Sequence, residues 1–215
     1  MRRPKRLPME QLAPHLLDVS RPNPLAPASI LDWPQVFGND HPVEIEVGSG
    51  KGAFLVATAE AHPDTNYLGI EIDKALHYYI ATRLAKRGLT NARVAGTDAR
   101  ALLTERVRAG SVRGVHVYFP DPWWKKRHHK RRVWTPEFAA ECVRVLAPGG
   151  RLHVATDVGD YYQIIRDLLE AQADLVRQWA DETAGPPAPD EALTNFERKA
   201  RQRGGAVYRA EYERR

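Results

Sequence analysis

The chain has 215 residues, which is enough to bury the core of one domain, and no internal repeat is visible. Its 32 Lys and Arg residues outnumber its 27 Asp and Glu residues, and the excess lies near both ends and at residues 125–132. A single cysteine, Cys142, excludes an internal disulfide and a cysteine-rich zinc site, and no apolar run reaches the roughly 20 residues that a membrane span needs. These features favour a cytoplasmic protein with a polyanionic partner.

Residues 1–40 contain prolines at positions 4, 8, 14, 22, 24, 27 and 34. Prolines at this spacing disfavour regular helix and central strand. We therefore predict a basic, extended N-terminal arm over residues 1–40, followed by one folded domain over residues 41–215.

From residue 43, short β-branched segments alternate with longer helical ones. Strands are predicted at 43–47, 67–72, 91–96, 114–119 and 151–156, and helices at 51–61, 74–87, 99–108, 135–145 and 160–171. This alternation predicts an α/β fold with a doubly wound, mostly parallel sheet. Residues 205–213 are expected to add an antiparallel strand at the edge of that sheet.

Three glycines follow the first predicted strand, in the stretch EVGSGKGAF. Gly48, Gly50 and Gly52 would let the backbone turn sharply at the start of a helix and approach a ligand closely. The stretch also fits the G-x-G-x-x-A form of a dinucleotide fingerprint through Ala53. On its own it therefore favours neither NAD nor S-adenosylmethionine (SAM).

Three acids near the strand ends help to distinguish these two cofactors. Glu71 ends the second strand, where a carboxylate can accept hydrogen bonds from the ribose of either cofactor. Glu46 lies two residues before Gly48, where it would repel the pyrophosphate of NAD and attract the ammonium and sulfonium groups of SAM. Asp98 follows the third strand and adds an acceptor for an adenine amino group. As a set these acids favour SAM, although each could instead cap a helix or face solvent.

The stretch VYFPDPWWKKRHHKRRVW places one carboxylate beside dense positive charge. Asp121 lies between Pro120 and Pro122, and each proline is expected to push the residue before it toward extended geometry. His128 and His129 lack a neighbouring carboxylate cluster, so no metal site is predicted. The stretch also offers side chains for stacking on a base, with core packing as the alternative, and cations for phosphates: Trp123, Trp124 and Trp134, and Lys125, Lys126, Arg127, Lys130, Arg131 and Arg132.

From about residue 40 onward, these motifs together resemble the bacterial tRNA (guanine-N7)-methyltransferases. The resemblance rests on EVGSGKG, on GIEID, on FPDPW followed by KKRHHKRR, on Thr156-Asp157 before Tyr161, and on TNFE at 194–197. It implies a Rossmann-like class I SAM-dependent methyltransferase fold, with the variable-loop guanine at tRNA position 46 as substrate. One departure is Trp124, which stands where the family pattern Pro-Trp-Pro-Lys usually has its second proline.

The resemblance also implies roles for individual residues. Contacts to SAM are implied for Glu46, Glu71, Asp98 and Asp121, and Asp121 would also be the catalytic-site acid. The substrate nucleoside would be contacted by Lys125, Asp157, Thr194, Asn195, Phe196 and Glu197.

Methylation of guanine at N7 needs little acid–base chemistry, because N7 carries a lone pair and no proton. The enzyme must align the reacting atoms and stabilise a purine that becomes cationic, a role that we expect for Asp121 and Glu197. A nucleophilic cysteine is not needed, and Cys142 is expected in the core of a helix.

Three other function classes remain open at this point. An NAD-dependent oxidoreductase is disfavoured by Glu46. A SAM-dependent enzyme acting on another nucleic-acid base or an exocyclic amine is closer, and a non-catalytic RNA-binding module would not need the glycine loop and its acids. The sequence implies no membrane association and no obligate protein partner.

Overall fold

The structure is a computed structural model that describes residues 7–20, 29–181 and 206–215. The chain divides into two compact units, residues 1–108 and residues 109–215. Thr194, Asn195, Phe196 and Glu197 lie outside the described residues.

The first unit contains parallel strands in the order β1-β4-β3-β2. These strands are β1 (Leu16–Leu17), β2 (Val43–Val47), β3 (Asn66–Ile70) and β4 (Ala92–Ala95). Its helices are α1 (Met9–Leu12), the 3-10 helix η1 (Ala13–His15), α2 (Trp33–Phe37), α3 (Ala53–Ala61), α4 (Lys74–Arg87) and α5 (Ala99–Arg106).

Local signals explain the helix boundaries in this unit. The Asp73 carboxylate accepts hydrogen bonds from the backbone N–H groups of Ala75 and Leu76 at the start of α4. Gly88 ends the same helix in the left-handed conformation. The prediction of a helix at 74–87 is confirmed.

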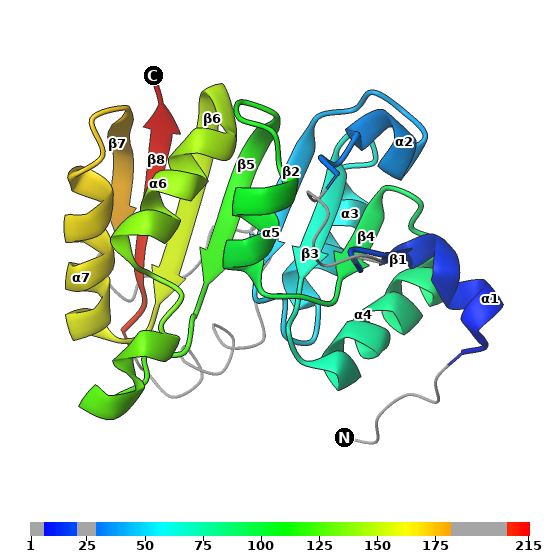
Figure 1. The fold of residues 1–215 in the computed structure, drawn as a ribbon, viewed down its shortest axis with the longest axis horizontal. Helices are drawn as coiled ribbons and strands as arrows, with labels where there is room; N and C mark the ends of the chain where they lie inside the picture. Colours follow the sequence, from blue (N-terminus) through cyan, green and yellow to red (C-terminus); the bar gives the residue numbers. More distant parts are fainter. Residues whose placement is uncertain (1–6, 21–28, 182–205) are drawn as a thin grey trace. The chain divides into compact units, whose positions relative to one another are not determined.

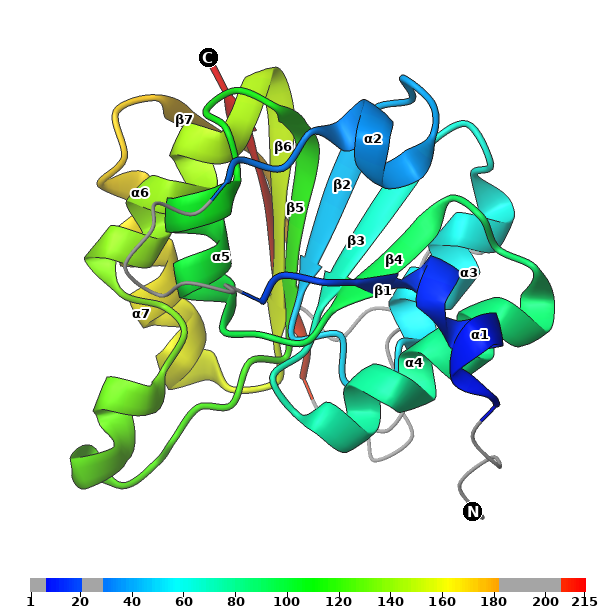
Figure 2. The ribbon, with the colours of Figure 1, turned by 45° about the vertical axis from the view of Figure 1, so that its right-hand side comes forward.

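The N-terminal segment differs from the extended arm that the prolines predict. Residues 7–20 include α1, η1 and the two-residue strand β1, which pairs with β4. Figure 2 shows α1 beside α4 and β1 beside β4. Prolines permit these short helices because Pro14 and Pro34 occupy first-turn positions, where no backbone donor is needed.

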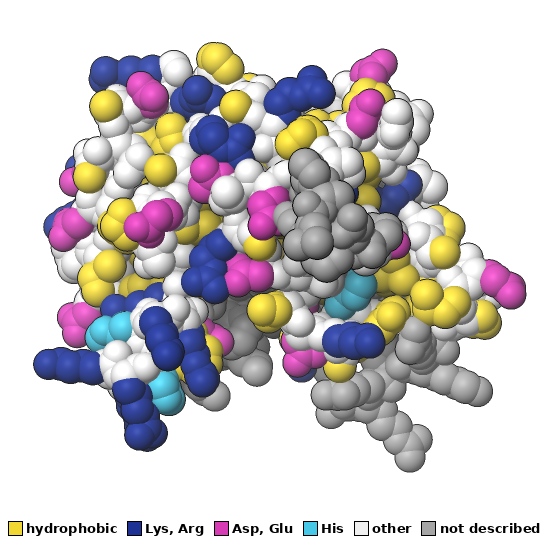
Figure 3. Space-filling view, in the orientation of Figure 1, with side chains coloured by type: hydrophobic (Ala, Val, Ile, Leu, Met, Phe, Trp, Pro, Cys, Tyr) yellow, Lys and Arg dark blue, Asp and Glu magenta, His cyan; other side chains and the backbone are white. Residues whose placement is uncertain are grey.

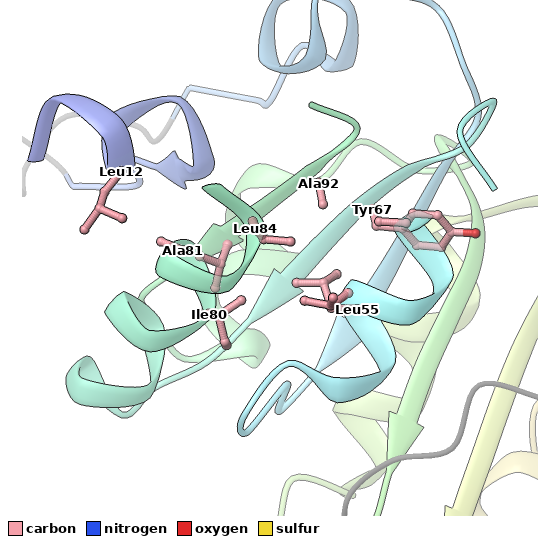
Figure 4. Close-up of a cluster of buried hydrophobic side chains, with 10 residues drawn as sticks. Leu12, Leu55, Tyr67, Ile80, Ala81, Leu84 and Ala92 are labelled. Carbon is pink, nitrogen blue, oxygen red and sulfur yellow. The ribbon is translucent and has the colours of Figure 1, made fainter. Parts of the chain in front are cut away.

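Leu12 anchors this segment in the core of the first unit. Its side chain is fully buried in a cluster with residues of α3, α4, β3 and β4 (Figure 4). Burying a leucine is worth about 2 kcal/mol, so this contact holds the segment against the sheet.

The second unit has strands in the order β5-β6-β8-β7. Strands β5 (Val112–Tyr118) and β6 (Leu146–Thr156) run parallel, whereas β8 (Tyr208–Arg214) is antiparallel to both β6 and β7 (Leu175–Asp181). The 3-10 helix η2 (Lys126–Arg131) precedes α6 (Pro136–Val145) and α7 (Gly159–Glu170), and both α helices cover one face of these strands (Figure 1).

The predicted α/β fold with mostly parallel strands and an antiparallel C-terminal strand is confirmed. The expected position of that strand at the edge of the sheet is wrong, because β7, which was not predicted, takes the outer position beside β8. Strand β8 is therefore paired on both sides.

Candidate functional site

The glycine loop after β2 turns as its sequence predicts. Gly48, Gly50 and Gly52 have φ values of 74°, 54° and 64°, a region that residues with a side chain rarely adopt. The backbone N–H of Gly48 donates to the carbonyl of Ile70 at 2.9 Å, which seats the loop against the end of β3.

Glu71 links this loop to the turn that follows β3 by two hydrogen bonds. One carboxylate oxygen accepts a hydrogen bond from the Gly50 N–H at 2.7 Å, and the other accepts from the Asp73 N–H at 2.8 Å. Burial raises the pKa of Glu71, and these two donors act in the opposite direction. The structure thus brings Glu71 and the glycine loop together, at the end of β3 where the sequence places this acid.

Glu46 is buried on β2 beneath the same loop, with 5% of its surface exposed. Burial raises the pKa of its carboxyl to about 7; hydrogen bonding to Ser49 and to the backbone of Leu55 lowers it, and the charge of Glu71 raises it further. Its Oε2 atom has no hydrogen-bond partner among the described residues. A buried oxygen without a donor is costly, so this atom fits a site that a ligand donor completes.

Asp98 is tied to a neighbouring arginine. It caps α5 by accepting from the Arg100 N–H at 2.9 Å, and its carboxylate pairs with the Arg100 guanidinium at 2.7 Å. The hydrogen bond from Arg100 holds the pKa of Asp98 below its usual range. For this acid the helix-capping role is observed directly.

Two residues of the first unit that lie at this site were not selected from the sequence. Gly69 on β3 lies under the loop: an added Cβ would sit 2.6 Å from Ser49 Oγ and 2.7 Å from Leu55 Cδ2. Ile72, next to Glu71, is 72% exposed. A glycine inside an apolar strand was the available signal for the first, whereas the exposure of Ile72 depends on the turn.

The Asp121 loop of the second unit has a strained backbone on both sides. Phe119 and Trp123 have φ values of 50° and 45°, unusual for residues with large side chains. The expectation that Pro120 makes Phe119 extended is wrong. The Phe119 N–H donates to Ala155 O at 2.7 Å, continuing the β5–β6 ladder to the point where the loop begins.

Two arginines of the basic stretch contact this loop. The Arg132 Nε donates to the carbonyl of Pro122 at 2.7 Å, and its guanidinium lies 4.9 Å from the centre of the Tyr161 ring. The Arg131 guanidinium lies 4.9 Å from the Trp123 ring. Cation–π contacts of this kind fix the aromatic side chains that flank Asp121.

The three tryptophans of the stretch occupy different environments. Trp134 is 3% exposed and packs edge-on against Phe138, so it belongs to the core. Trp123 is partly buried and meets His128 edge-on. Trp124 is 69% exposed.

The remaining cations of the stretch face outward. No residue of η2 is buried, and Lys125 just before it is also exposed. Lys, Arg and His side chains gather on this segment, drawn green at the lower left of Figure 1 and in dark blue and cyan in Figure 3.

Asp157 is exposed after the end of β6, immediately before α7. The adjacent Thr156 is buried, and its hydroxyl accepts from the Val158 N–H at 3.3 Å. Tyr161 in the first turn of α7 is buried, and its hydroxyl lacks a hydrogen-bond partner in the described chain. Burial raises the pKa of Tyr161 to about 12, to which the nearby Asp121 charge contributes.

Cys142 is fully buried in α6, as expected, and burial raises the pKa of its thiol. Within residues 7–20, 29–181 and 206–215, no group of three or more His, Cys, Asp or Glu residues could hold a metal ion. Nor does any helix of that part combine the length and apolar character that crossing a membrane requires.

Comparison with known proteins assigns the family. The model of the family described as "Putative methyltransferase" matches residues 40–210. The tRNA (guanine-N(7)-)-methyltransferase of Rhodopirellula baltica is 45% identical over 186 residues, covering 84% of this chain and 69% of that protein. The protein of the same name from Alkalilimnicola ehrlichii is 40% identical, covering 86% of this chain and 78% of its own length.

The chain belongs to the tRNA (guanine-N7)-methyltransferase family. Solved structures match this methyltransferase at the level of fold. The 16S rRNA methyltransferase KamB gives a TM-score of 0.62 at 18% identity, covering 85% of this chain and 92% of that one. The antibiotic-resistance methyltransferase Kmr gives a TM-score of 0.56 at 20% identity, over 81% and 87%. The class I methyltransferase fold is therefore confirmed.

Proposed function

We propose that this methyltransferase transfers the methyl group of SAM to N7 of the guanine at position 46 in the tRNA variable loop, forming 7-methylguanosine. Family membership supports the reaction. The observation that carries the choice of cofactor is the buried Glu46 Oε2 beneath the glycine loop, which no donor of the described residues reaches. That site suits a cationic cofactor without phosphate, because a pyrophosphate would meet an uncompensated carboxylate.

The glycine loop and four acids, Glu46, Glu71, Asp98 and Asp121, are proposed to contact SAM. The loop of Gly48, Gly50 and Gly52 approaches SAM closely, and Glu46 lies near the cationic methionine end of SAM. The Glu71 carboxylate accepts hydrogen bonds from the ribose hydroxyls. It does so with the lone pairs that remain after it has bound the backbone N–H groups of Gly50 and Asp73. Asp98 accepts from the adenine amino group. Ile72, whose exposure is otherwise unexplained, covers an apolar face of the adenine.

Substrate recognition falls to residues of the second unit. Lys125, Asp157 and the segment Thr194-Asn195-Phe196-Glu197 contact the target nucleoside, and the exposed cations around η2 hold the tRNA backbone. Because a folded tRNA stacks its bases, the target guanine must be drawn partly out of its stack. These functions suit a cytoplasmic enzyme that works without a metal ion.

Bound SAM supplies an electrophilic methyl group on a sulfonium. The lone pair of guanine N7 would form the new bond to the methyl carbon while the methyl–sulfur bond breaks and its electron pair stays on sulfur, which leaves neutral S-adenosylhomocysteine. Because N7 carries no proton that must leave first, the protein need not supply a general base. Asp121 and Glu197 stabilise the positive charge that develops on the purine. The strained loop at Phe119 and Trp123 fixes the approach of Asp121 before the substrate arrives.

The test is methyl transfer from labelled SAM to an unmodified tRNA transcript with guanine at position 46, followed by nucleoside identification and mapping. A matched transcript lacking that guanine is the control. The expected result is 7-methylguanosine in the first transcript alone. A different methylated nucleoside would favour an enzyme acting on another base or an exocyclic amine, and would remove the roles given to Lys125, Asp157 and Glu197.

A further inference from the structure

Trp124 is the most exposed tryptophan in the described part of the chain, and it lies three residues after Asp121. Its indole ring is a rigid surface with an apolar face and an N–H donor, and it is open to a binding partner. Its two companions in the same stretch differ, because Trp134 lies in the core and Trp123 is partly buried.

The backbone that leads to Trp124 is held in place. Arg132 hydrogen-bonds to the Pro122 carbonyl, and the Trp123 ring contacts Arg131 and the edge of His128. Trp123 itself has a positive φ, which a residue of this size adopts only when its surroundings impose it. These contacts hold the two residues directly before Trp124, whose own side chain is exposed to solvent.

The surroundings of Trp124 identify the class of partner. Exposed cations follow it directly: Lys125, Lys126, Arg127 and Lys130. In the part of the chain that the structure describes, none of these four side chains pairs with an acidic residue, so the surface attracts a polyanion. A flat aromatic face beside a row of cations matches an unpaired nucleobase beside its phosphates.

We propose that Trp124 stacks on an unpaired base of the tRNA and strengthens binding of the RNA without taking part in methyl transfer. This inference rests on the proposed function, because it takes tRNA as the substrate. It divides the stretch into an inner part, formed by Trp123, Arg131 and Arg132, that supports the Asp121 loop, and an outer surface led by Trp124 that meets RNA.

The experiment compares Trp124→Ala and Trp124→Phe with the wild-type protein. Trp179→Ala is the matched control, since Trp179 is 50% exposed on β7 and lies outside the stretch. For each protein, tRNA affinity, SAM affinity and kcat at saturating tRNA are measured. Thermal unfolding checks that each variant is folded. Because both tryptophans are exposed, the substitutions should leave the melting temperature unchanged.

Trp124→Ala should weaken tRNA binding about tenfold, the typical effect of one lost base–aromatic stack, with SAM affinity and kcat within about twofold of wild type. Trp124→Phe should recover most of the affinity because it keeps an aromatic face. Trp179→Ala should bind tRNA normally. Heparin, a polyanion without bases, should bind wild type and Trp124→Ala equally.

Normal tRNA binding by Trp124→Ala would overturn the inference, and so would an equal loss of heparin and tRNA affinity. A fall in kcat with unchanged tRNA affinity would also overturn it, by moving Trp124 into the chemical step. These outcomes differ from failure of the proposed function, in which the wild-type protein itself would not methylate tRNA.

Discussion

Burial of Glu46 couples its protonation to folding and to binding of a cationic cofactor. Its pKa in the folded protein is about 7, against an ordinary value of 4.5. The folded state therefore holds this proton more tightly than the unfolded state. The contribution of Glu46 to stability is greatest below about pH 4.5 and falls by roughly 3 kcal/mol as pH rises through 7.

Binding of SAM should show the opposite pH dependence. Ionised Glu46 attracts the cation, so SAM affinity should rise between pH 5.5 and about 7 and level off above it. Glu46→Gln should bind SAM weakly at every pH and unfold at a higher temperature than wild type at pH 8. Calorimetric titrations and melting curves would measure both. A wild-type SAM affinity that does not change over this range would remove Glu46 from the cofactor site.

Arg132 illustrates how a residue in a basic run acquires a role that its charge does not indicate. Because it holds the Pro122 carbonyl and the Tyr161 ring, Arg132→Ala should release the Asp121 loop. We expect kcat at saturating tRNA to fall about tenfold or more, with little change in the salt dependence of tRNA binding. Arg132→Lys keeps the charge but lacks the planar group, so it should not restore kcat.

The control for Arg132 is Arg177→Ala, which removes a surface arginine paired with Glu170 and should leave kcat unchanged. If Arg132→Ala kept full kcat but reduced the salt dependence of tRNA binding, Arg132 would be a phosphate ligand instead of a positioning residue.

At the scale of elements, the contact between the glycine loop and β3 depends on the absence of a side chain at Gly69. Gly69→Ala would press a methyl group against Ser49 and Leu55, at a cost of about 1–3 kcal/mol, and would lift the loop from its seat. Both thermal stability and SAM affinity should fall.

Gly88→Ala separates these two effects. Gly88 ends α4 with a φ of 63° and open space around it, so alanine there costs about 1 kcal/mol of strain without touching the loop. Its melting temperature should fall while SAM affinity stays normal. If Gly69→Ala bound SAM with wild-type affinity, the glycine loop would be able to shift without loss of SAM binding.

The elements that were predicted correctly from the sequence have local signals that mark where they begin and end. Helix α4 runs between the Asp73 cap and Gly88, and β2 is the uninterrupted stretch VEIEV. Strand β7 was missed because its sequence, LVRQWAD, has mostly exposed side chains and lacks regular alternation. Its position depends on pairing with β8, which is distant in sequence.

In the candidate site, too, some features follow from the local sequence and others from tertiary contacts. The glycines, Glu46, Glu71 and Asp121 could be selected from sequence because each stands beside a strand end. The pairing of Asp98 with Arg100, the burial of Glu46 and the support that Arg132 gives to Pro122 follow from tertiary contacts. No pattern in the sequence separates Trp124 from Trp134, yet one is exposed and the other lies in the core.

For the molecule as a whole, the net charge of +5 matters less than where the charge lies. tRNA affinity should fall steeply with salt, because phosphate contacts release counterions. Lys126→Ala should lower the slope of log K against log salt by about one. Lys86→Ala, at an exposed position on α4, should leave that slope unchanged. Equal slopes for both variants would show that the tRNA backbone does not contact η2.

The position of β8 between β6 and β7 bears on how the chain folds as it leaves the ribosome. Strand β7 emerges before its partner, and until β8 is synthesised both β6 and β7 present unpaired backbone along the edges that β8 will join. The first unit contains none of these strands and can form earlier. A nascent chain that stalls before residue 208 would therefore expose two open strand edges, a state prone to aggregation and to capture by chaperones.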